Sequence, residues 1–373
     1  MATRSDEEPV EPLSSAPTSP LPAATPPNPS STVPPPALTR TRKLPRPPRS
    51  ARGLGALGPV LGGFVDSPER QREFEARLRD ASEPPRLGRY DILGIIGRGS
   101  VTTVLRALDP EDGHEIAIRV IHSDIDGRHG RRMLREARAM AELSHPNLMQ
   151  TLHVDTVARH IFLVMELVRG KNLRKWMGST PRPTWADCVQ VYIQAGEGLA
   201  AMHAAGLVHR DFKPSSAIVD KDGRVRVIDF RLVLVPDDSP LIAPDNDDPV
   251  DGTANPGAVL GTPAYMPLAQ LRGRPADPYS DQFSFCVSLY ESLYGHRPFE
   301  GETVAALMRS MGSEHVRPAP GRTRVPSELR EVVLRGLALE PHKRWNSMPD
   351  LLASLREVLR NKANPPRWRA WWR

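Results

Sequence analysis

Cysteine and long apolar runs, which mark disulfide-rich and membrane-spanning proteins, are both scarce in this chain. Its 373 residues include two cysteines, Cys188 and Cys286, which lie far apart in apolar surroundings. Packing as small apolar side chains in a reducing compartment is favoured over a disulfide between them. No uninterrupted apolar stretch approaches the ~20 residues that a membrane-spanning helix needs, and there is no charged-then-apolar leader at the start. We therefore expect a cytoplasmic protein.

Lysine is scarce as well. Seven of the 50 basic residues are lysines and 43 are arginines, a bias that usually reflects genome composition, and the net charge is only +6. At this modest charge we expect no nucleic-acid partner. The hydrophobic content of 39% and the charged content of 25% fit a soluble globular protein with disordered segments attached.

Proline, in contrast, is abundant: the chain has 40, concentrated in its first fifty residues. Residues 1–63 combine them with Ser, Thr and Ala, so we expect a disordered tail with polyproline-II character. The basic run at residues 40–52 is interpreted as a solvated tether in preference to a contact for an anionic membrane, nucleic acid or acidic partner. Residues 64–86 predict a linker with one short helix over 67–81.

A second tail, residues 361–373, closes the chain. It holds three tryptophans and three arginines: Trp368, Trp371, Trp372, Arg367, Arg369 and Arg373. Trp and Arg together suit a membrane interface or an aromatic-binding groove, but so short a segment holds a bilayer weakly. Intramolecular packing or a protein contact is therefore favoured over a membrane contact.

Residues 87–360, between the tails, carry the periodicity of a folded α+β domain. Residues 90–96 and 101–108 are interpreted as two strands, and residues 115–121 alternate at period two, as in a third strand. Apolar residues recur at helical spacing at residues 131–143, 184–205, 280–295, 325–338 and 349–361. The pattern predicts a small β-rich lobe over 87–168 followed by a larger helical lobe over 169–360.

The most polar stretch inside this domain is residues 209–219, His-Arg-Asp-Phe-Lys-Pro-Ser-Ser-Ala-Ile-Val. So many charges between apolar flanks are costly to fold unless they converge on one site. The stretch resembles the catalytic loop H-R-D-L-K-P-x-N of protein kinases, and six such motifs follow in family order over residues 87–360. The resemblance implies a bilobal protein-kinase fold, with Asp211 as the base that accepts the substrate hydroxyl proton and Lys213 as the phosphate-facing lysine. Residues 261–266 and 280–289 resemble the bacterial (Hanks-type) serine/threonine kinases.

The resemblance also assigns a phosphate-cradling glycine loop. Kinases use G-x-G-x-x-G-x-V, so that backbone N–H groups approach the phosphates with no Cβ between them. Gly97, Gly99 and Val104 match this pattern, but Thr102 stands at the third glycine, where a β-branched side chain crowds the phosphates. A plain β-turn is the alternative.

A further departure falls on the strand residue that holds the α- and β-phosphates in kinases. Arg119 stands where the family's V-A-I-K motif has lysine, and Glu136 matches the helix glutamate that pairs with it. We expect an Arg119–Glu136 ion pair, and a guanidinium fork that suits a carboxylate better than two phosphates. No lysine occurs in residues 87–168, which excludes a relocated lysine.

An ATP site is implied by the residues that match the family's adenine slot. The matching residues are Val104, Ala117 and Ile218 around the base, Met165 as gatekeeper, and Glu166 and Val168 in the hinge. Ordinary core packing is the alternative for these residues.

Two residues match the family's Mg²⁺ ligands. Asp229, in Asp229-Phe230-Arg231, can bind the ion through a hard carboxylate oxygen. Ser216 stands where the family has Asn, and its hydroxyl is a shorter and weaker ligand. Arg231 replaces the glycine of D-F-G, at roughly 1–2 kcal/mol if a left-handed backbone is needed there. ATP and Mg²⁺ are therefore expected as weakened cofactors.

The segment after Asp229 carries six aspartates between residues 237 and 251. We interpret it as a solvated acidic loop. The alternative is that these aspartates permanently supply the negative charge that a phosphorylated residue would present to Arg210. Beyond it, Ala269 replaces the glutamate of A-P-E whose expected partner is Arg344. Loss of one partner of a buried pair costs about 3–5 kcal/mol unless the arginine finds another acceptor. Asp281 matches the carboxylate that braces the catalytic loop.

The departures share one property: each falls on a residue that touches phosphate, metal or substrate. They are Thr102, Arg119, Ser216, Arg231 and Ala269. We therefore interpret the chain as a pseudokinase with a regulatory or scaffolding function that still binds ATP. A slow Ser/Thr kinase using Asp211, Asp229 and Arg119 is the alternative, and an interaction protein working through its tails is a second. Neither reading identifies the protein partner or substrate.

Overall fold

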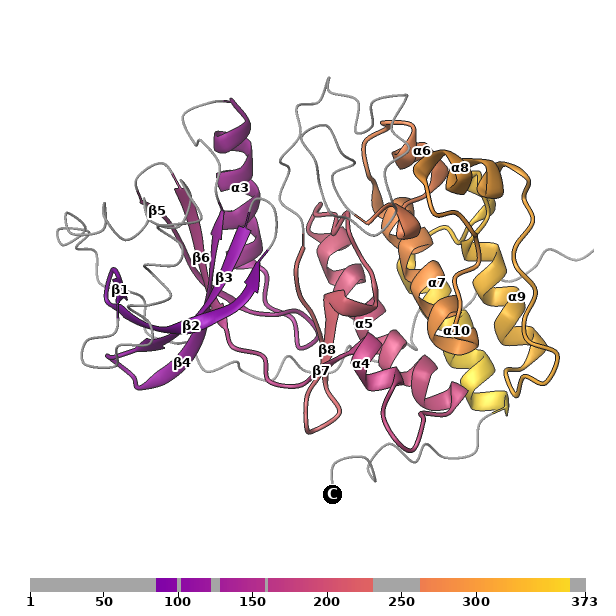
Figure 1. Cartoon of the computed structure of the whole chain (residues 1–373), viewed down its shortest axis with the longest axis horizontal. Helices are drawn as coiled ribbons and strands as arrows, with labels where there is room; N and C mark the ends of the chain where they lie inside the picture. The colour runs from indigo at the N-terminus through magenta and orange to yellow at the C-terminus, as the bar shows by residue number, and fades with distance from the viewer. Residues whose placement is uncertain (1–84, 99–101, 122–127, 158–159, 231–261, 363–373) are drawn as a thin grey trace, which may run out of the picture. The chain divides into compact units, whose positions relative to one another are not determined.

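Six strands form an antiparallel sheet in the first part of the domain (Figure 1). The computed structural model describes residues 85–98, 102–121, 128–157, 160–230 and 262–362. In the order β1-β2-β3-β4-β6-β5, the strands are β1 Arg86–Leu87, β2 Tyr90–Arg98, β3 Thr102–Asp109, β4 His114–Ile121, β6 His160–Glu166 and β5 Thr151–Val157. Helix α3, Arg128–Glu142, packs on this sheet beside β5. Residues 1–63, the helix expected over 67–81 and residues 363–373 lie outside the described residues, whereas Asn361 and Lys362 of the expected C-terminal tail belong to α10.

The two faces of the sheet belong to two different cores, as period-two alternation requires. Ile116, Ile118 and Val120 of β4 pack on the outer face with residues of β2, β3 and β6. Ala117 and Ile121, of the opposite parity, join the large core that also holds α3 and the helical lobe. Arg119 has the parity of this inward face, so the strand pattern itself directs a cation toward the junction of the lobes.

The larger lobe is helical, with a small sheet at its edge. The three strands of that sheet, in the order β7-β8-β9, are β7 Lys171–Asn172, β8 Ala217–Val219 and β9 Val225–Val227. The helices are α4 Leu173–Met177, α5 Trp185–Ala204, α6 Leu268–Leu271, α7 Pro278–Tyr294, α8 Val304–Gly312, α9 Ser327–Gly336 and α10 Met348–Lys362. Helix α5 packs against α7 and α10, and α9 packs against the same two helices (Figure 1). A bilobal α+β fold of the kinase type is thereby confirmed.

Local sequence signals set the starts of the two central helices. Thr184 and Asp187 form a capping box at the start of α5, with Asp187 N–H donating to Thr184 Oγ1 at 3.2 Å. Asp277 and Ser280 do the same for α7, with Pro278 at the first helical position. Helix α7 therefore begins two residues before the expected 280. The short elements α4, α6 and α8 and the sheet β7–β9 were not expected, because so few residues establish no periodicity.

Both cysteines are buried and free, which confirms the expected packing. Burial raises the pKa of both thiols, that of Cys286 to about 12. Among the described residues, no helix is long and apolar enough to cross a membrane.

The close approach of α5 to the segment before β5 depends on Gly198. A Cβ built there would lie 2.5 Å from the main-chain oxygen of Asn147, which also accepts a hydrogen bond from Val227 N–H. We expect Gly198→Ala to lower the free energy of unfolding by roughly 1–3 kcal/mol in urea denaturation. Gly312→Ala is the matched control, because nothing lies within 4 Å of the added methyl. Because alanine favours a helix more than glycine does, equal effects in both variants would show that the close approach to Asn147 does not decide the result.

Candidate functional site

The polar stretch at residues 209–219 lies between α5 and β8 and is held in place by Asp281 of α7. The Asp281 side chain is 1% exposed, and its two carboxylate oxygens accept hydrogen bonds from His209 N–H and Arg210 N–H, both at 2.8 Å. His203 Nε2 lies 2.8 Å from the same carboxylate. The bracing expected of Asp281 is confirmed, and these bonds support the positive φ of 70° at Arg210.

Asp211 and Lys213 meet, as the candidate base and its neighbouring cation should. Lys213 Nζ donates to Asp211 Oδ2 at 2.9 Å and to Thr262 Oγ1 at 2.6 Å. Thr262 N–H donates to Asp211 Oδ1 at 3.3 Å. Thr262 was not singled out from the sequence, although it stands in the family-like residues 261–266. This corner of the site is assembled and partly open to solvent.

The segment that follows Thr262 is anchored by Tyr265. Its hydroxyl donates to Glu291 Oε2 at 2.6 Å and accepts from Arg174 Nη2 at 2.6 Å. Ser284 Oγ donates to its main-chain oxygen at 2.8 Å. Burial, reinforced by the Glu291 carboxylate, raises the pKa of the Tyr265 hydroxyl. The segment beside the catalytic loop is therefore anchored by hydrogen bonds although Ala269 replaces the A-P-E glutamate.

Arg119 binds Asp229, the candidate metal ligand. Arg119 Nη2 donates to Asp229 Oδ1, and Nη1 donates to the main-chain oxygen of Phe230 at 3.1 Å. The guanidinium also lies over the Phe230 ring, 5.8 Å from its centroid, and Arg119 is 8% exposed. Asp229 itself has a positive φ of 58°. One arginine therefore fixes both the side chain of Asp229 and the backbone that follows it.

Glu136 is paired with the catalytic-loop arginine. Arg210 Nη1 donates to Glu136 Oε2 at 2.8 Å and Arg210 Nη2 to Oε1 at 3.3 Å, a two-point contact between α3 and the loop. Arg132 Nε lies 3.5 Å from the same carboxylate. The expected Arg119–Glu136 ion pair is therefore wrong: the structure pairs Arg119 with Asp229 and Glu136 with Arg210.

Both residues expected to hold Mg²⁺ make contacts within the protein in this arrangement. The Asp229 carboxylate is bonded to Arg119, and Ser216 Oγ donates to the main-chain oxygen of Asp211 at 3.1 Å, so its hydroxyl is engaged away from Asp229. The Asp229 side chain is nevertheless 50% exposed, and the bond to Arg119 engages only its Oδ1 oxygen. The residues expected to hold Mg²⁺ are occupied by protein contacts.

The residues matched to the adenine slot line one face of the sheet. Val104 of β3 is the cross-strand partner of Arg119, and Ala117 is the partner of Met165. Ala117 and Met165 are buried, while Val104 is half-buried and faces the same side. Gly97 lies opposite Val104 across the β2–β3 pair. A Cβ built at Gly97 would lie 3.5 Å from Val104 Cβ, an ordinary contact distance. Ala117 and Met165 belong to the large core, and Val104 packs against it.

The hinge between the lobes is fixed by Glu166. Its N–H donates to the main-chain oxygen of Gln150 at 3.0 Å, and its carboxylate meets Arg226 Nε at 3.2 Å. Val168 follows in the link to β7 and is half-buried, as is Ile218 of β8. Gly170 comes so close to β8 that a Cβ there would lie 2.2 Å from the Val219 main-chain oxygen. Ile218 itself pairs with Asn172 of β7 and Arg226 of β9 in the small sheet.

Arg344 has found other acceptors in place of the missing glutamate. It is 2% exposed and donates to the main-chain oxygens of Ala338, Leu339 and Tyr279, at 2.8, 3.0 and 2.7 Å. Desolvation lowers its pKa to about 10, so it stays protonated at neutral pH. Ala269 thus leaves no buried cation without partners, and the expected loss of stability does not arise.

Three expected features lie outside the described residues. They are Gly99 of the glycine loop, Arg231 after Asp229-Phe230, and the aspartates of residues 237–251. The departure Thr102 is the first residue of β3 and is half-buried.

Comparison with known proteins finds protein kinases. A family model described as protein kinase domain matches residues 90–355. Serine/threonine-protein kinase PknL of Mycobacterium tuberculosis is 33% identical over 296 residues, which cover 78% of this chain and 71% of PknL. The PknA kinase of Mycobacterium bovis is 31% identical over 290 residues, covering 75% of this chain and 63% of PknA.

Two further matches are more distant or more partial. The probable serine/threonine-protein kinase PknB of Corynebacterium glutamicum is 30% identical over 73% of this chain but 42% of its own length, so the match spans less than half of that relative. The solved structure of Rad53 residues 1–466 in complex with AMP-PNP has a TM-score of 0.57 and 22% identity, and covers 71% of this chain and 64% of that one. This last likeness is one of fold.

Proposed function

The chain belongs to the protein kinase domain family, and from that premise we propose that it is a pseudokinase, a regulatory or scaffolding homologue of the serine/threonine kinases that binds ATP without efficient phosphotransfer. The single observation that carries the proposal is the contact of Arg119 with Asp229 and Phe230 O. It uses the carboxylate that a working kinase gives to the metal.

The pairing is costly to undo. Arg119 is almost fully buried, and its Nε has no hydrogen-bond partner among the described residues. If Asp229 turned away, the guanidinium would keep one described acceptor, the Phe230 oxygen. Breaking a fully buried pair costs roughly 3–5 kcal/mol, and the half-exposed Asp229 carboxylate places this pair below that range. A lysine ammonium, a compact point charge, does not impose the same two-point geometry.

Glu136 supports the same conclusion from the other lobe. Its two oxygens are engaged by Arg210, so α3 is tied to the catalytic loop. In the family, this glutamate holds the phosphate-binding lysine, and the lysine is absent here. The junction of the lobes is thus closed by two arginine–carboxylate pairs, both made within the protein.

One observation favours the alternative of a slow but active Ser/Thr kinase. Asp211, Lys213 and Thr262 form an intact set of hydrogen bonds beside a rigid contact surface. With these hydrogen bonds in place, the chain keeps Asp211 as a candidate base and Lys213 as a candidate phosphate-facing cation. Measurable autophosphorylation that disappears in Asp211→Ala would favour this alternative.

ATP binding that does not depend on Mg²⁺ is the direct prediction of the proposal. Saturating ATP is expected to raise the melting temperature by about 5–10 °C, equally in Mg²⁺ and in EDTA, because Arg119 satisfies the Asp229 carboxylate. Differential scanning fluorimetry measures both conditions. Ala117→Val, which adds two methyl groups to the slot, should reduce the shift in both conditions alike. A shift that appears only with Mg²⁺ would show that Asp229 is free to bind metal.

A further inference from the structure

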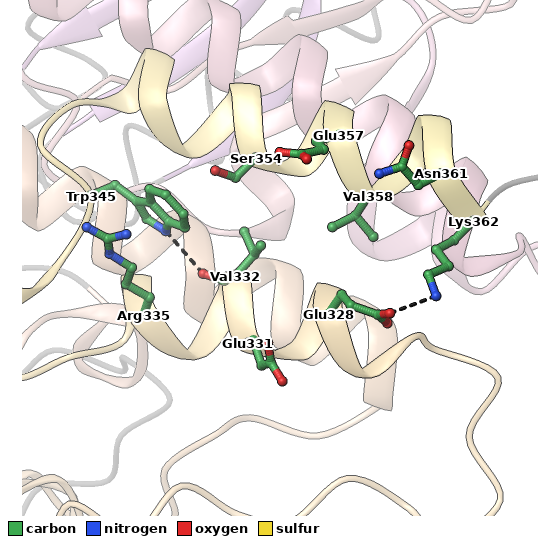
Figure 2. A pocket seen from close by; sticks show the side chains of 10 residues that line it. All are labelled: Glu328, Glu331, Val332, Arg335, Trp345, Ser354, Glu357, Val358, Asn361 and Lys362. Carbon is green, nitrogen blue, oxygen red and sulfur yellow. Dashed lines mark hydrogen bonds and ion pairs between the residues drawn. The ribbon is translucent and has the colours of Figure 1, made fainter. Parts of the chain in front are cut away.

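Helices α9 and α10 leave a groove of about 420 Å³ between them (Figure 2). It is lined by one face of each helix, at residues 328–335 of α9 and 354–362 of α10. The lining residues recur at intervals of three and four, so each face is continuous along its helix. The groove therefore follows from the packing of the two helices along their length.

The groove has an apolar floor. Figure 2 shows Val332 and Val358 between the two helices, with the Trp345 indole closing one end. Trp345 Nε1 donates to the main-chain oxygen of Val332 at 3.2 Å, and the Arg335 guanidinium lies 4.0 Å from the centre of the indole ring. A floor of two valines with a fixed indole suits large flat apolar side chains.

Three glutamates line the rims, against two cations, Arg335 on the indole and Lys362. Glu328 is paired with Lys362 at 2.7 Å, where the groove meets the end of α10. Glu331 and Glu357, one from each helix, are exposed and make no hydrogen bond or ion pair with another described residue. An occupant that carries aromatic and positively charged side chains would satisfy both floor and rims.

The chain supplies such a segment directly after Lys362, which itself lines the groove. Asn364-Pro365-Pro366 stops helix α10, because proline has no N–H to continue it and restricts the residue before it. Residues 367–373 follow; fully extended they span ~23 Å, against ~11 Å for the α9 face. They are long enough to run the length of the groove.

The sequence of this segment has the alternation that the groove requires. At period two, Trp368, Ala370 and Trp372 fall on one side, and Arg367, Arg369 and Arg373 fall on the other with Trp371. We propose that residues 367–373 fold back as an extended segment into the α9–α10 groove of the same molecule. Trp368 and Trp372 lie on the Val332, Val358 and Trp345 floor, and the arginines meet Glu331 and Glu357.

Cleavage by an arginine-specific protease tests the proposal in the full chain. A seated segment protects the bonds after Arg367 and Arg369, and mass spectrometry measures how fast they are cut. Trp368→Ala with Trp372→Ala removes the two buried rings, and we expect cleavage to accelerate at least ~10-fold. Trp371→Ala is the matched control, because this ring is assigned to the outer side and its removal should leave the rate unchanged.

The groove side is tested by removing its unpaired charges. Glu331→Gln with Glu357→Gln should accelerate cleavage roughly threefold, and added salt should do the same in the wild type but not in the double variant. Glu302→Gln, an exposed glutamate outside the groove, is the control. Both glutamates are exposed, so neither change threatens the fold, which the melting temperature verifies.

A labelled peptide of residues 363–373 gives an independent readout. It should bind the chain truncated after Lys362 and bind the full chain at least ~10-fold more weakly, because the tethered copy occupies the groove. Equal binding to both, or tail cleavage that neither set of variants alters, would overturn the proposal. So would light scattering that finds the tail joining two copies, or anionic vesicles that bind the tail while the groove variants have no effect.

Discussion

Arg119→Lys combined with Ser216→Asn is expected to raise phosphotransfer from ATP to protein hydroxyls by roughly 10²–10³-fold. Arg119 bonds the Asp229 carboxylate and the Phe230 main-chain oxygen at the same time, and a lysine ammonium does not reproduce this fork. The Asp229 oxygens are thereby released. The amide oxygen that Ser216→Asn introduces then supplies a ligand where the Ser216 hydroxyl is now bonded to Asp211 O. A radiolabelled phosphate assay with a generic protein substrate measures the gain.

The controls for this variant separate chemistry from folding. Arg309→Lys makes the same exchange at an exposed residue of α8 and should change nothing. Ser216 is 1% exposed, so the larger asparagine side chain of Ser216→Asn adds volume to a packed site and is expected to lower stability by about 1–3 kcal/mol. Adding Asp211→Ala should abolish the gain. If the folded, ATP-binding double variant remains inactive, Arg119 and Ser216 do not limit the reaction, and Thr102 or Ala269 becomes the next candidate.

The main elements of the fold were predictable because period and caps are local signals. Alternation over residues 115–121 predicts β4, and the inward parity of Arg119 follows from it. Threonine and aspartate caps fix the starts of α5 and α7 within a residue or two of expectation. Strands of two or three residues, such as β7, have no period to detect, and they form only because β8 and β9 lie beside them in space.

The pairing of charges in the site was not predictable in the same way. The sequence states which charges exist, and motif order places Asp211, Lys213 and Asp281 correctly. Which carboxylate Arg119 meets, however, depends on where α3 lies relative to the catalytic loop, a tertiary property. The acceptors of Arg344 could not be predicted either. They are main-chain oxygens, which every residue carries, so no residue type in the sequence indicates them.

Asp281→Ala is expected to lower the free energy of unfolding by roughly 3–5 kcal/mol, more than any change in the candidate chemical groups. The substitution leaves two buried N–H groups, of His209 and Arg210, without acceptors and removes the partner of His203. The loop at Arg210 also loses the bonds that hold its positive φ. Urea denaturation followed by fluorescence measures the midpoint and the slope, and an unchanged slope assigns the difference to stability.

Two further variants, Asp281→Asn and Asp211→Ala, show whether the loss of unfolding free energy is specific to the Asp281 carboxylate. Asp281→Asn should fall between wild type and Asp281→Ala, because its single oxygen replaces one of two acceptors. Asp211→Ala should cost less than about 1 kcal/mol, because Lys213 keeps its bond to Thr262 and is partly exposed. A large loss on Asp211→Ala would mean that the candidate base supports the fold itself. The expected order instead separates the two aspartates. Asp281, which holds the loop, is needed for the stability of the fold. Asp211, which would act as the base, can be removed with little loss of stability, as a kinase fold used for binding would allow.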